Sequence, residues 1–434
     1  PGTPGRPPAA NPAAGHLGVV GWSLSGYLPD TCGVSVRRQG IDRTLRVGSR
    51  EFTGPGDSAG VRIVMVAESF LPQINGVANT VRHVTDRLLA HGHQSLIIAA
   101  GPGPDSYHGV RVIRARSFGI PGYKEFPVGL PDPAIERAMG EFKPDLVHLA
   151  SPFILGAYGL RSARRLGLPT VAVFQTDLAG FARQYPWFAK ADRGVQAWVR
   201  RVHSRADRTL APSSASMTQL IQAGVPRVHH WGRGVNLDLF DPMNRDEQWR
   251  RELSPAGKPI VGYVGRLAAE KKVRRLAELS ELDCQVVVVG DGPDRASLEI
   301  SLPQATFLGM RRGEDLAAIF AGLDVFVHTG EHETFCQTIQ EAQASGVATV
   351  GPAAGGPLDL IRHGETGLLF EPGQTGSLRQ AVAHLLDNSE ARKAMAAAGL
   401  SRVQTRTWPA VVDDLVDRHY VEVLREVAAV RRVA

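Results

Sequence analysis

Short apolar runs alternate with amphipathic stretches from residue 61 onward. The first group of runs predicts strands at 62–67, 95–100, 146–149, 170–174 and 209–211. A second group predicts strands at 259–265, 285–290, 305–308, 323–328 and 348–350. Runs that are apolar at nearly every position suit parallel strands buried on both faces of a sheet. Two such groups in series therefore predict an α/β protein with two Rossmann-like domains, 61–240 and 241–405.

The stretches between the runs have the period of helices. Val77, Val81, Val84 and Leu88 fall on one helical face, and the pair His91-Gly92 is a good helix stop. A last helix is predicted from Trp408 to Val430, too late in the chain to extend the second sheet. We expect this 406–434 segment to pack back on the first domain.

The first sixty residues have a different composition. They contain 12 Gly and 7 Pro and show neither a helical nor an alternating pattern. The first methionine is Met65. We therefore expect residues 1–60 to be a disordered extension or the product of a mis-set start.

Composition excludes several classes of protein. No run of eighteen apolar residues without charge occurs, which argues against a membrane-spanning helix. Cys32, Cys284 and Cys336 are far apart, so neither a disulfide framework nor a zinc site is indicated, and a reducing cytoplasm fits best. The net charge of +6 is not gathered into one block and predicts no nucleic-acid partner.

Two glutamates mark the most informative stretch. Glu333 follows the strand predicted at 323–328, and Glu341 lies eight residues later, about two turns into the next helix. Both carboxylates can then line one cleft, with a helix N-terminus between them that suits a diphosphate flanked by hydroxyl groups. The spacing alone would also fit two chance glutamates on a solvated helix.

The surrounding motifs resemble those of a known family. Glu333, Glu341, the triplet Ala344-Ser345-Gly346 and the loop Gly355-Gly356-Pro357-Leu358-Asp359 resemble the signature of the retaining glycosyltransferases of family 4. The likeness runs from about Val61 to Tyr420. It implies the GT-B fold, in which two Rossmann-like domains face a central cleft. It also implies that Glu333 holds hydroxyls of the transferred sugar and Glu341 the ribose.

A basic loop follows the first strand of the second domain. The stretch Gly265-Arg266-Leu267-Ala268-Ala269-Glu270-Lys271 is similar to a family loop whose Arg and Lys bind the donor's phosphates. A departing nucleoside diphosphate needs such compensation. No two aspartates lie two residues apart, so no metal or other cofactor is expected, and Arg266 and Lys271 take the place of a metal cation. The alternative is a surface ion pair among Glu270, Lys271 and Lys272.

Two first-domain loops carry weaker signals. Gly76 would let backbone amides approach a sugar or phosphate, although Asn75-Gly76 is also an ordinary turn. Gln175 stands where many relatives carry His in a His-Thr-Asp motif, and it cannot act as an acid or base. Asp177 remains a candidate ligand of the sugar or acceptor, with helix capping as its alternative.

Three further positions are predicted from the resemblance to contact the donor. Gly290 begins a loop that resembles the one beside the nucleotide base, and a plain turn explains it equally well. Phe335-Cys336 replaces a common Phe-Gly, so Cys336 narrows the sugar pocket or merely fills space. The segment 232–240 matches a family hinge and is predicted to be mainly architectural.

One surface combines aromatic and basic residues. Between Phe181 and Arg208 the chain mixes Trp187 and Phe188 with several arginines, as suits a face lying on anionic lipid. The alternative is a pair of helices that pack their aromatic side chains inward.

Within this family, the chain resembles the GDP-mannose-dependent α-mannosyltransferases of actinobacteria that act on glycolipids. It implies transfer of a hexose, expected to be mannose, to a membrane glycolipid of the glucuronosyl diacylglycerol or phosphatidylinositol mannoside type, as in lipomannan synthesis. The expected partners are a nucleotide sugar, a lipid or glycolipid acceptor and the anionic inner face of the cell membrane, where the enzyme would be peripheral. The alternatives are a UDP-sugar-dependent enzyme with a soluble acceptor, or a nucleotide-sugar epimerase, against which Gln175 argues.

Overall fold

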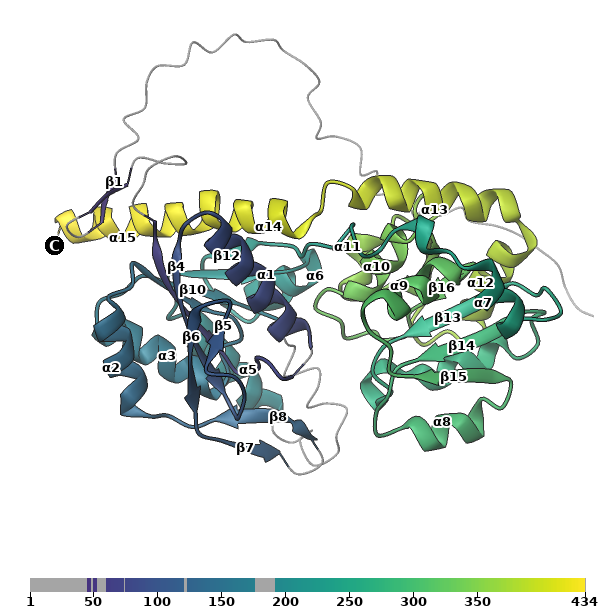
Figure 1. Ribbon diagram of the computed structural model, residues 1–434, viewed down its shortest axis with the longest axis horizontal. Coiled ribbons are helices and arrows are strands. Elements are labelled where there is room, and N and C mark those ends of the chain that lie inside the picture. The colour runs from purple at the N-terminus through teal and green to yellow at the C-terminus, as the bar shows by residue number, and fades with distance from the viewer. Residues whose placement is uncertain are drawn as a thin grey trace, which may run out of the picture. The chain divides into compact units, whose positions relative to one another are not determined.

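The computed structural model describes residues 45–47, 50–52, 60–73, 75–120, 123–175 and 192–433. From Gly60 onward these residues form two α/β domains with separate sheets, as the sequence predicts (Figure 1).

The first domain is built on a sheet with the strand order β12-β11-β10-β9-β3-β4-β6-β5. All of its pairs are parallel except the edge pair of β5 and β6. Its strands are β3 (Arg62–Ala67), β4 (Gln94–Ala100), β5 (Ser106–Tyr107), β6 (Val110–Ala115), β9 (Leu146–Leu149), β10 (Thr170–Val173), β11 (Arg208–Ala211) and β12 (Val228–His230). The five strands predicted for this domain are confirmed, and β5, β6 and β12 are additional.

Helices of the first domain connect these strands and cover the sheet on both faces. They are α1 (Gly76–Ala90), α2 (Pro133–Phe142), α3 (Ile154–Arg165), α5 (Asp192–His203) and α6 (Ser214–Gln222). A hairpin of β7 (Ser117–Ile120) and β8 (Tyr123–Gly129) lies between β6 and α2. Alternate residues of β3 belong to two different cores: Ile63 packs in the cluster with Leu88 of α1, and Val64 packs in the cluster with Leu160 of α3.

The second domain has the parallel order β15-β14-β13-β16-β17-β18. Its strands are β13 (Ile260–Val264), β14 (Gln285–Val289), β15 (Ala305–Gly309), β16 (Val325–Val327), β17 (Ala348–Pro352) and β18 (Gly367–Phe370). Its helices are α7 (Glu247–Leu253), α8 (Arg295–Ser301), α9 (Gly313–Gly322), α10 (Gln337–Ala344), α11 (Pro357–Leu360), α12 (Ser377–Asp387) and α13 (Ser389–Val403), with short 3₁₀ turns η2 (Pro242–Asn244), η3 (Ala269–Lys271) and η4 (Val273–Leu279). The strand order reverses between β13 and β16, which makes their carboxyl ends the switch point where ligands bind in open α/β sheets.

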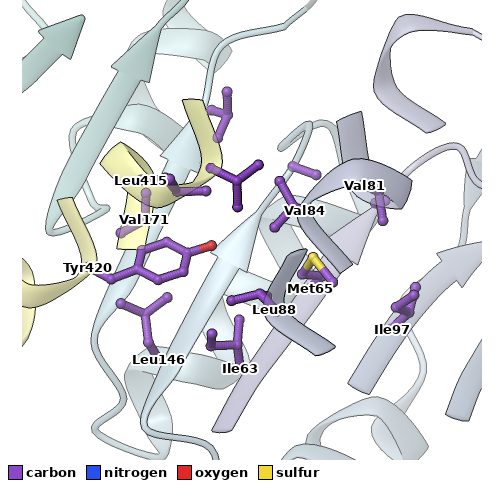
Figure 2. Close-up of a cluster of buried hydrophobic side chains, with 14 of the residues drawn as sticks. Ile63, Met65, Val81, Val84, Leu88, Ile97, Leu146, Val171, Leu415 and Tyr420 are labelled. Carbon is purple, nitrogen blue, oxygen red and sulfur yellow. The ribbon is translucent and has the colours of Figure 1, made fainter. Parts of the chain in front are cut away.

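The chain returns to the first domain at its C-terminal end, which confirms the predicted packing. α14 (Trp408–Asp414), a π-helical turn (η5, Leu415–Tyr420) and α15 (Val421–Val433) follow one another. Leu415 and Tyr420 lie in the same buried cluster as Ile63 and Leu88 (Figure 2). Arg87 of α1 adds an ion pair to Asp413, with Nε donating to Oδ1 at 2.7 Å.

Some residues before the predicted domain boundary at 240 already pack with the second domain. Val235 and Phe240 pack in a core of the second domain, and Val235 pairs with Thr407 as the chain crosses back. The segment that leaves the first domain and the segment that returns to it therefore run side by side near Gly234. The apolar side chains that follow this glycine belong to the core of the second domain.

The N-terminal segment also differs from the prediction. Within residues 1–60, β1 (Leu45–Val47) pairs antiparallel with β2 (Arg50–Phe52). This short hairpin is consistent with the alternating apolar and polar residues of Leu45-Arg46-Val47, and it corrects the expectation that the whole segment lacks secondary structure. Among the described residues, no helix is long and apolar enough to cross a membrane.

A buried hydrogen bond fixes the returning helix. The hydroxyl of Tyr420 is 2.8 Å from Nδ1 of His148, and burial lowers the pKa of His148 to about 4, so the imidazole is neutral at pH 7. Tyr420→Phe is expected to lower the free energy of unfolding by about 1–2 kcal/mol, because it leaves a buried ring nitrogen without a partner. Urea denaturation measures this, with Tyr158→Phe, whose hydroxyl bonds to no described residue, as the control. Equal losses in both variants would contradict the prediction.

Candidate functional site

Two loops meet at the switch point of the second domain. The loop after β13 carries Arg266 and ends in η3, which contains Lys271. The loop after β16 runs from His328 to Cys336 and leads into α10. Because β13 and β16 are parallel neighbours, both loops leave the same edge of the sheet.

Lys271 and Glu333 are in direct contact. The ammonium of Lys271 donates a hydrogen bond to Oε1 of Glu333. The hydroxyl of Thr329 donates to the carbonyl oxygen of Lys271 at 2.6 Å, which holds the two loops together. The residue predicted to bind the donor's phosphates therefore lies against the residue predicted to bind its sugar.

Both groups of this pair are charged at neutral pH. Burial alone would raise the pKa of Glu333, but Lys271 and His328 hold it well below its usual range. Burial opposes the ammonium form of Lys271, and Glu333 outweighs burial and raises the pKa of Lys271. Glu333 can thus accept hydrogen bonds from sugar hydroxyls, while Lys271 keeps further N–H donors for an anion.

His328 is a site residue that sequence reasoning missed. It ends the strand predicted at 323–328, and its Nε2 lies 3.2 Å from Oε1 of Glu333. The imidazole stacks on the ring of Tyr263, with centroids 6.3 Å apart. Burial opposes its charged form, but Cys336 and Glu333 outweigh burial and raise its pKa to about 9. A histidine directly after a buried strand, at the start of the switch-point loop, was the signal in the sequence.

The charge of His328 predicts a loss of stability in alkaline solution. A histidine whose folded pKa is raised to about 9 contributes stability that is fully present below its unfolded pKa of 6.5 and is lost as pH rises through 9. The free energy of unfolding of the wild type is expected to fall by about 2 kcal/mol between pH 6 and pH 10 relative to His328→Asn. Denaturant titrations at several pH values measure the difference. Parallel pH profiles would contradict the charged histidine.

The neighbouring lysine forms a second pair across the same loops. Lys272 donates to Oε2 of Glu331 at 2.6 Å, and Arg275 lies 4.0 Å from the other carboxylate oxygen. Each lysine therefore reaches a glutamate on the other loop, and the charge of Glu270 also acts on Lys271.

Glu341 lies closer to the start of its helix than predicted. α10 begins at Gln337, so Glu341 is one turn into the helix rather than two. Burial raises the pKa of its carboxyl to about 7. No described residue donates a hydrogen bond to this carboxylate, so a half-buried acceptor that can bind ribose hydroxyls lies at the start of the second turn of α10.

Phe335 and Cys336 belong to the core rather than to the cleft. Both side chains are buried in a cluster of the second domain. Cys336 has φ 79° and ψ 73°, a left-handed conformation that favours glycine. Of the two roles considered for Cys336, the structure favours filling space.

Gly290 is required by backbone packing. Its φ is 136°, and a Cβ atom there would lie 1.9 Å from the carbonyl oxygen of Gly265. The loop after β14 can therefore rest on the loop that carries Arg266.

The first-domain wall of the site is organised around Arg233, a second residue that sequence reasoning missed. Its Nη2 donates to Oε1 of Gln175 at 2.7 Å, and its Nη1 donates to the carbonyl oxygen of Gly76 at 3.3 Å. Gln175 in turn donates to the carbonyl oxygen of Ala150 at 2.6 Å. A Cβ atom on Gly76 would lie 2.8 Å from Nη1 of Arg233, so the missing side chain makes room for this guanidinium. Asp177 lies outside the described residues.

A cavity of about 420 Å³ opens between α5 and α6 of the first domain and the 331–334 loop of the second. Its walls combine apolar and amide side chains of the first domain with carboxylates of the second. The lining includes Phe174, Val199, Ser216, Gln222, Glu331 and Glu333.

Hydrogen bonds join the two domains beside this cavity. The hydroxyl of Thr334 donates to the carbonyl oxygen of Gln175 at 2.9 Å, and the amide of Ser214 donates to Oδ2 of Asp359 at 2.6 Å. The predicted cleft is present, and Asp359 of the glycine-rich loop ties the first turn of α6 to the second domain.

The surface predicted to meet lipid is described only in its last part. Trp187 and Phe188 lie outside the described residues. On α5, Trp198 packs against a core of the first domain, while Arg200 and Arg201 are exposed. In this part of the segment the aromatic side chain packs inward, as the alternative interpretation expects, and the arginines form an exposed basic face.

Two regions of the chain match known protein families. Residues 74–239 match the family described as Glycosyltransferase Family 4. Residues 244–402 match the family described as Glycosyl transferases group 1.

Curated relatives are similar over most of the chain. It is 52% identical over 372 residues to a GDP-mannose-dependent alpha-mannosyltransferase of Mycolicibacterium smegmatis, which covers 84% of this chain and 98% of the relative. A protein of the same name from Corynebacterium glutamicum is 43% identical and covers 84% of this chain and 89% of its own length. The sulfoquinovosyl transferase SQD2 of Arabidopsis thaliana is 30% identical over a region that covers 83% of this chain and 73% of that relative.

Solved structures share the two-domain fold. Sucrose-phosphate synthase from Thermosynechococcus elongatus superposes with a TM-score of 0.72 at 20% identity, covering 84% of this chain and 100% of that one. Anabaena HepE, in complex with UDP, has a TM-score of 0.68 at 19% identity, and the superposition covers 83% of this chain and 100% of HepE. At these identities the likeness establishes the GT-B-like fold.

Proposed function

Because this chain is a glycosyltransferase that belongs to family 4, we propose that it transfers mannose from GDP-mannose to an acceptor hydroxyl with retention of configuration. The relatives that are 43–52% identical carry the name GDP-mannose-dependent alpha-mannosyltransferase. The observation that carries the proposal is the contact between Lys271 and Glu333 at the switch point, which sets a cation for the diphosphate beside a carboxylate for the sugar.

Each residue then has a role in the reaction. Arg266 and Lys271 compensate the negative charge that grows on the diphosphate as the glycosidic bond breaks. Glu333 accepts hydrogen bonds from hydroxyls of the transferred sugar, and Glu341 accepts them from the ribose. No metal or other cofactor is needed in this scheme, because the basic loop supplies the positive charge.

The proton of the acceptor hydroxyl also needs a destination. Gln175 cannot accept it, and the charge of Glu333 is balanced by Lys271 and His328. The oxygen freed on the departing diphosphate is the base left in the scheme. A base on the leaving-group side places the acceptor on the same face of the sugar, which agrees with retention.

A second candidate donor has its own support. The structurally similar HepE was crystallised with UDP, so a UDP-sugar donor is kept as the alternative. An epimerase would need a titratable group for proton transfer at the sugar, and Gln175 does not supply one.

We place the acceptor at the cytoplasmic surface of the cell membrane, as a glycolipid. A relative that is 25% identical is named for mannosyl transfer to phosphatidylinositol dimannoside. The cavity beside Glu333 is lined on the first-domain side by apolar and amide groups, which suits a sugar headgroup with attached hydrocarbon.

The direct experiment supplies the donor and a mixture of acceptors. Purified protein is incubated with radiolabelled GDP-mannose or UDP-glucose and a membrane lipid extract, with and without EDTA. Labelled lipid from GDP-mannose in both conditions is expected. Label from UDP-glucose alone would favour the alternative donor, and loss of transfer in EDTA that Mg²⁺ restores would overturn the metal-free scheme.

Membrane docking predicts a salt-sensitive interaction. Arg200, Arg201 and Arg205 are exposed, and an arginine near an anionic surface contributes about 1 kcal/mol. Replacing all three with Glu is expected to reduce sedimentation with anionic vesicles and transfer to lipid, and to leave GDP affinity unchanged. Arg311→Glu, on an exposed loop of the second domain, is the control. Equal sedimentation of the wild type and the triple variant would make a soluble acceptor the better hypothesis.

A further inference from the structure

We propose that Arg233 is a third cation of the donor site and binds the terminal phosphate of the departing nucleoside diphosphate. The inference rests on the proposed function and adds a residue from the segment predicted to be an architectural hinge.

Arg233 is a buried charge whose partners are neutral. The residue is 8% exposed. Its guanidinium donates to an amide oxygen of Gln175 and to the carbonyl oxygen of Gly76, and it forms no ion pair with any described residue. Burial lowers its pKa to about 10, so it is still charged at neutral pH. A buried charge without a counter-ion is costly unless an anion binds beside it.

The position of the guanidinium adds to this imbalance. Gly76 is the first residue of α1, a helix of 15 residues, and a helix N-terminus carries about half a positive charge. The side chain of Asn75 already accepts from the amides of Val77 and Ala78, so the cap contributes no full negative charge. A cation held at the positive end of a helix is unfavourable until an anion is bound there.

The anion expected there is the donor's diphosphate. Glu333 is the carboxylate whose charge acts on Arg233, and it is already paired with Lys271 and His328. The charge of Glu333 is therefore shared with Lys271 and His328 and does not serve Arg233 as an ion-pair partner, which leaves Arg233 available to an anionic diphosphate. Arg233 is held by Gln175, whose carbonyl oxygen accepts from Thr334, the residue next to Glu333, so it would engage the phosphate when both domains contact the donor.

The test compares nucleotides that differ by one phosphate. Calorimetry measures GDP and GMP binding to the wild type, Arg233→Gln and Arg233→Lys. GDP affinity is expected to fall about 10- to 100-fold in Arg233→Gln, with GMP affinity changed less than about threefold and partial recovery in Arg233→Lys. Arg311→Gln is the control for loss of an exposed arginine. Equal losses for GDP and GMP, or no loss, would overturn the proposal.

Thermal denaturation separates binding from a structural role. If an uncompensated charge is removed, ligand-free Arg233→Gln should melt at or above the wild-type temperature, and GDP should stabilise it less. A lower melting temperature with unchanged GDP stabilisation would make Arg233 a structural residue. A raised KM for the acceptor with unchanged GDP affinity would instead assign it to an acidic group of the acceptor and would equally overturn the proposal.

A second variant keeps the charge and displaces it. Gly76→Ala places a Cβ atom 2.8 Å from the present position of Nη1 of Arg233, so the guanidinium must move and the same selective loss of GDP affinity is expected. If the wild type binds UDP rather than GDP, the GDP-mannose proposal fails. The comparison of UDP with UMP then tests Arg233 by the same criteria.

Discussion

Lys271→Ala is expected to lower the turnover of sugar transfer by about 10²-fold or more in a protein that still folds. The variant removes a cation of the diphosphate site, and it also removes the group that contacts Oε1 of Glu333. His328 would then be the remaining charged partner of Glu333, so the carboxylate that binds the sugar would change its position as well. Steady-state kinetics with saturating donor measure the loss, and circular dichroism checks the fold.

Lys272→Ala is the matched control. Lys272 is the next residue and has the same charge, but it pairs with Glu331. Its loss is expected to reduce turnover much less, because the contact to Glu333 remains. Comparable losses in the two variants would mean that general positive charge, rather than the position of Lys271, supports the reaction. Turnover near that of the wild type in Lys271→Ala would remove this residue from the phosphate site.

Central strands were the most predictable part of the fold. Runs such as Ile260–Val264 and Gln285–Val289 are almost wholly apolar, because both of their faces are covered by helices. The strand β6 was missed, since its sequence alternates apolar residues with Arg111 and Arg114 near the edge of the sheet. β18 was also missed, since it is only four residues long and begins with a glycine.

The site was predictable where the motif residues lie in loops that follow strands. Lys271 and Glu333 follow β13 and β16, and the topology makes those strands neighbours. Spacing in the sequence does not reveal that the two side chains touch, because the contact spans 62 residues. Arg233 was missed for the same reason: its partners Gly76 and Gln175 lie 157 and 58 residues away. His328 was taken for the end of a strand, and only its distance to Glu333 reveals its role.

Glu341→Gln is expected to weaken GDP binding by about 10- to 100-fold at pH 8, because hydrogen bonds from ribose hydroxyls to a carboxylate are stronger than those to an amide. Calorimetry with GDP measures the change. Glu333→Gln is the comparison, since loss of a sugar ligand should damage transfer more than affinity for free GDP. Equal GDP affinity in the wild type and Glu341→Gln would contradict the ribose assignment.

The pH dependence of GDP binding gives the same residue an independent test. Burial raises the pKa of Glu341 to about 7, so its carboxyl is mostly protonated at pH 6 and ionised at pH 8. The ionised form accepts hydrogen bonds from both ribose hydroxyls, and GDP affinity should therefore rise with pH through 7 in the wild type and stay flat in Glu341→Gln. For the ligand-free protein the sign is opposite. A folded pKa above the unfolded value of 4.5 costs stability as pH rises toward 7, so Glu341→Gln should melt higher than the wild type at pH 8 and not at pH 4. A variant that melts lower at pH 8 would show that the carboxylate stabilises the fold and would contradict its role as a ligand-binding group.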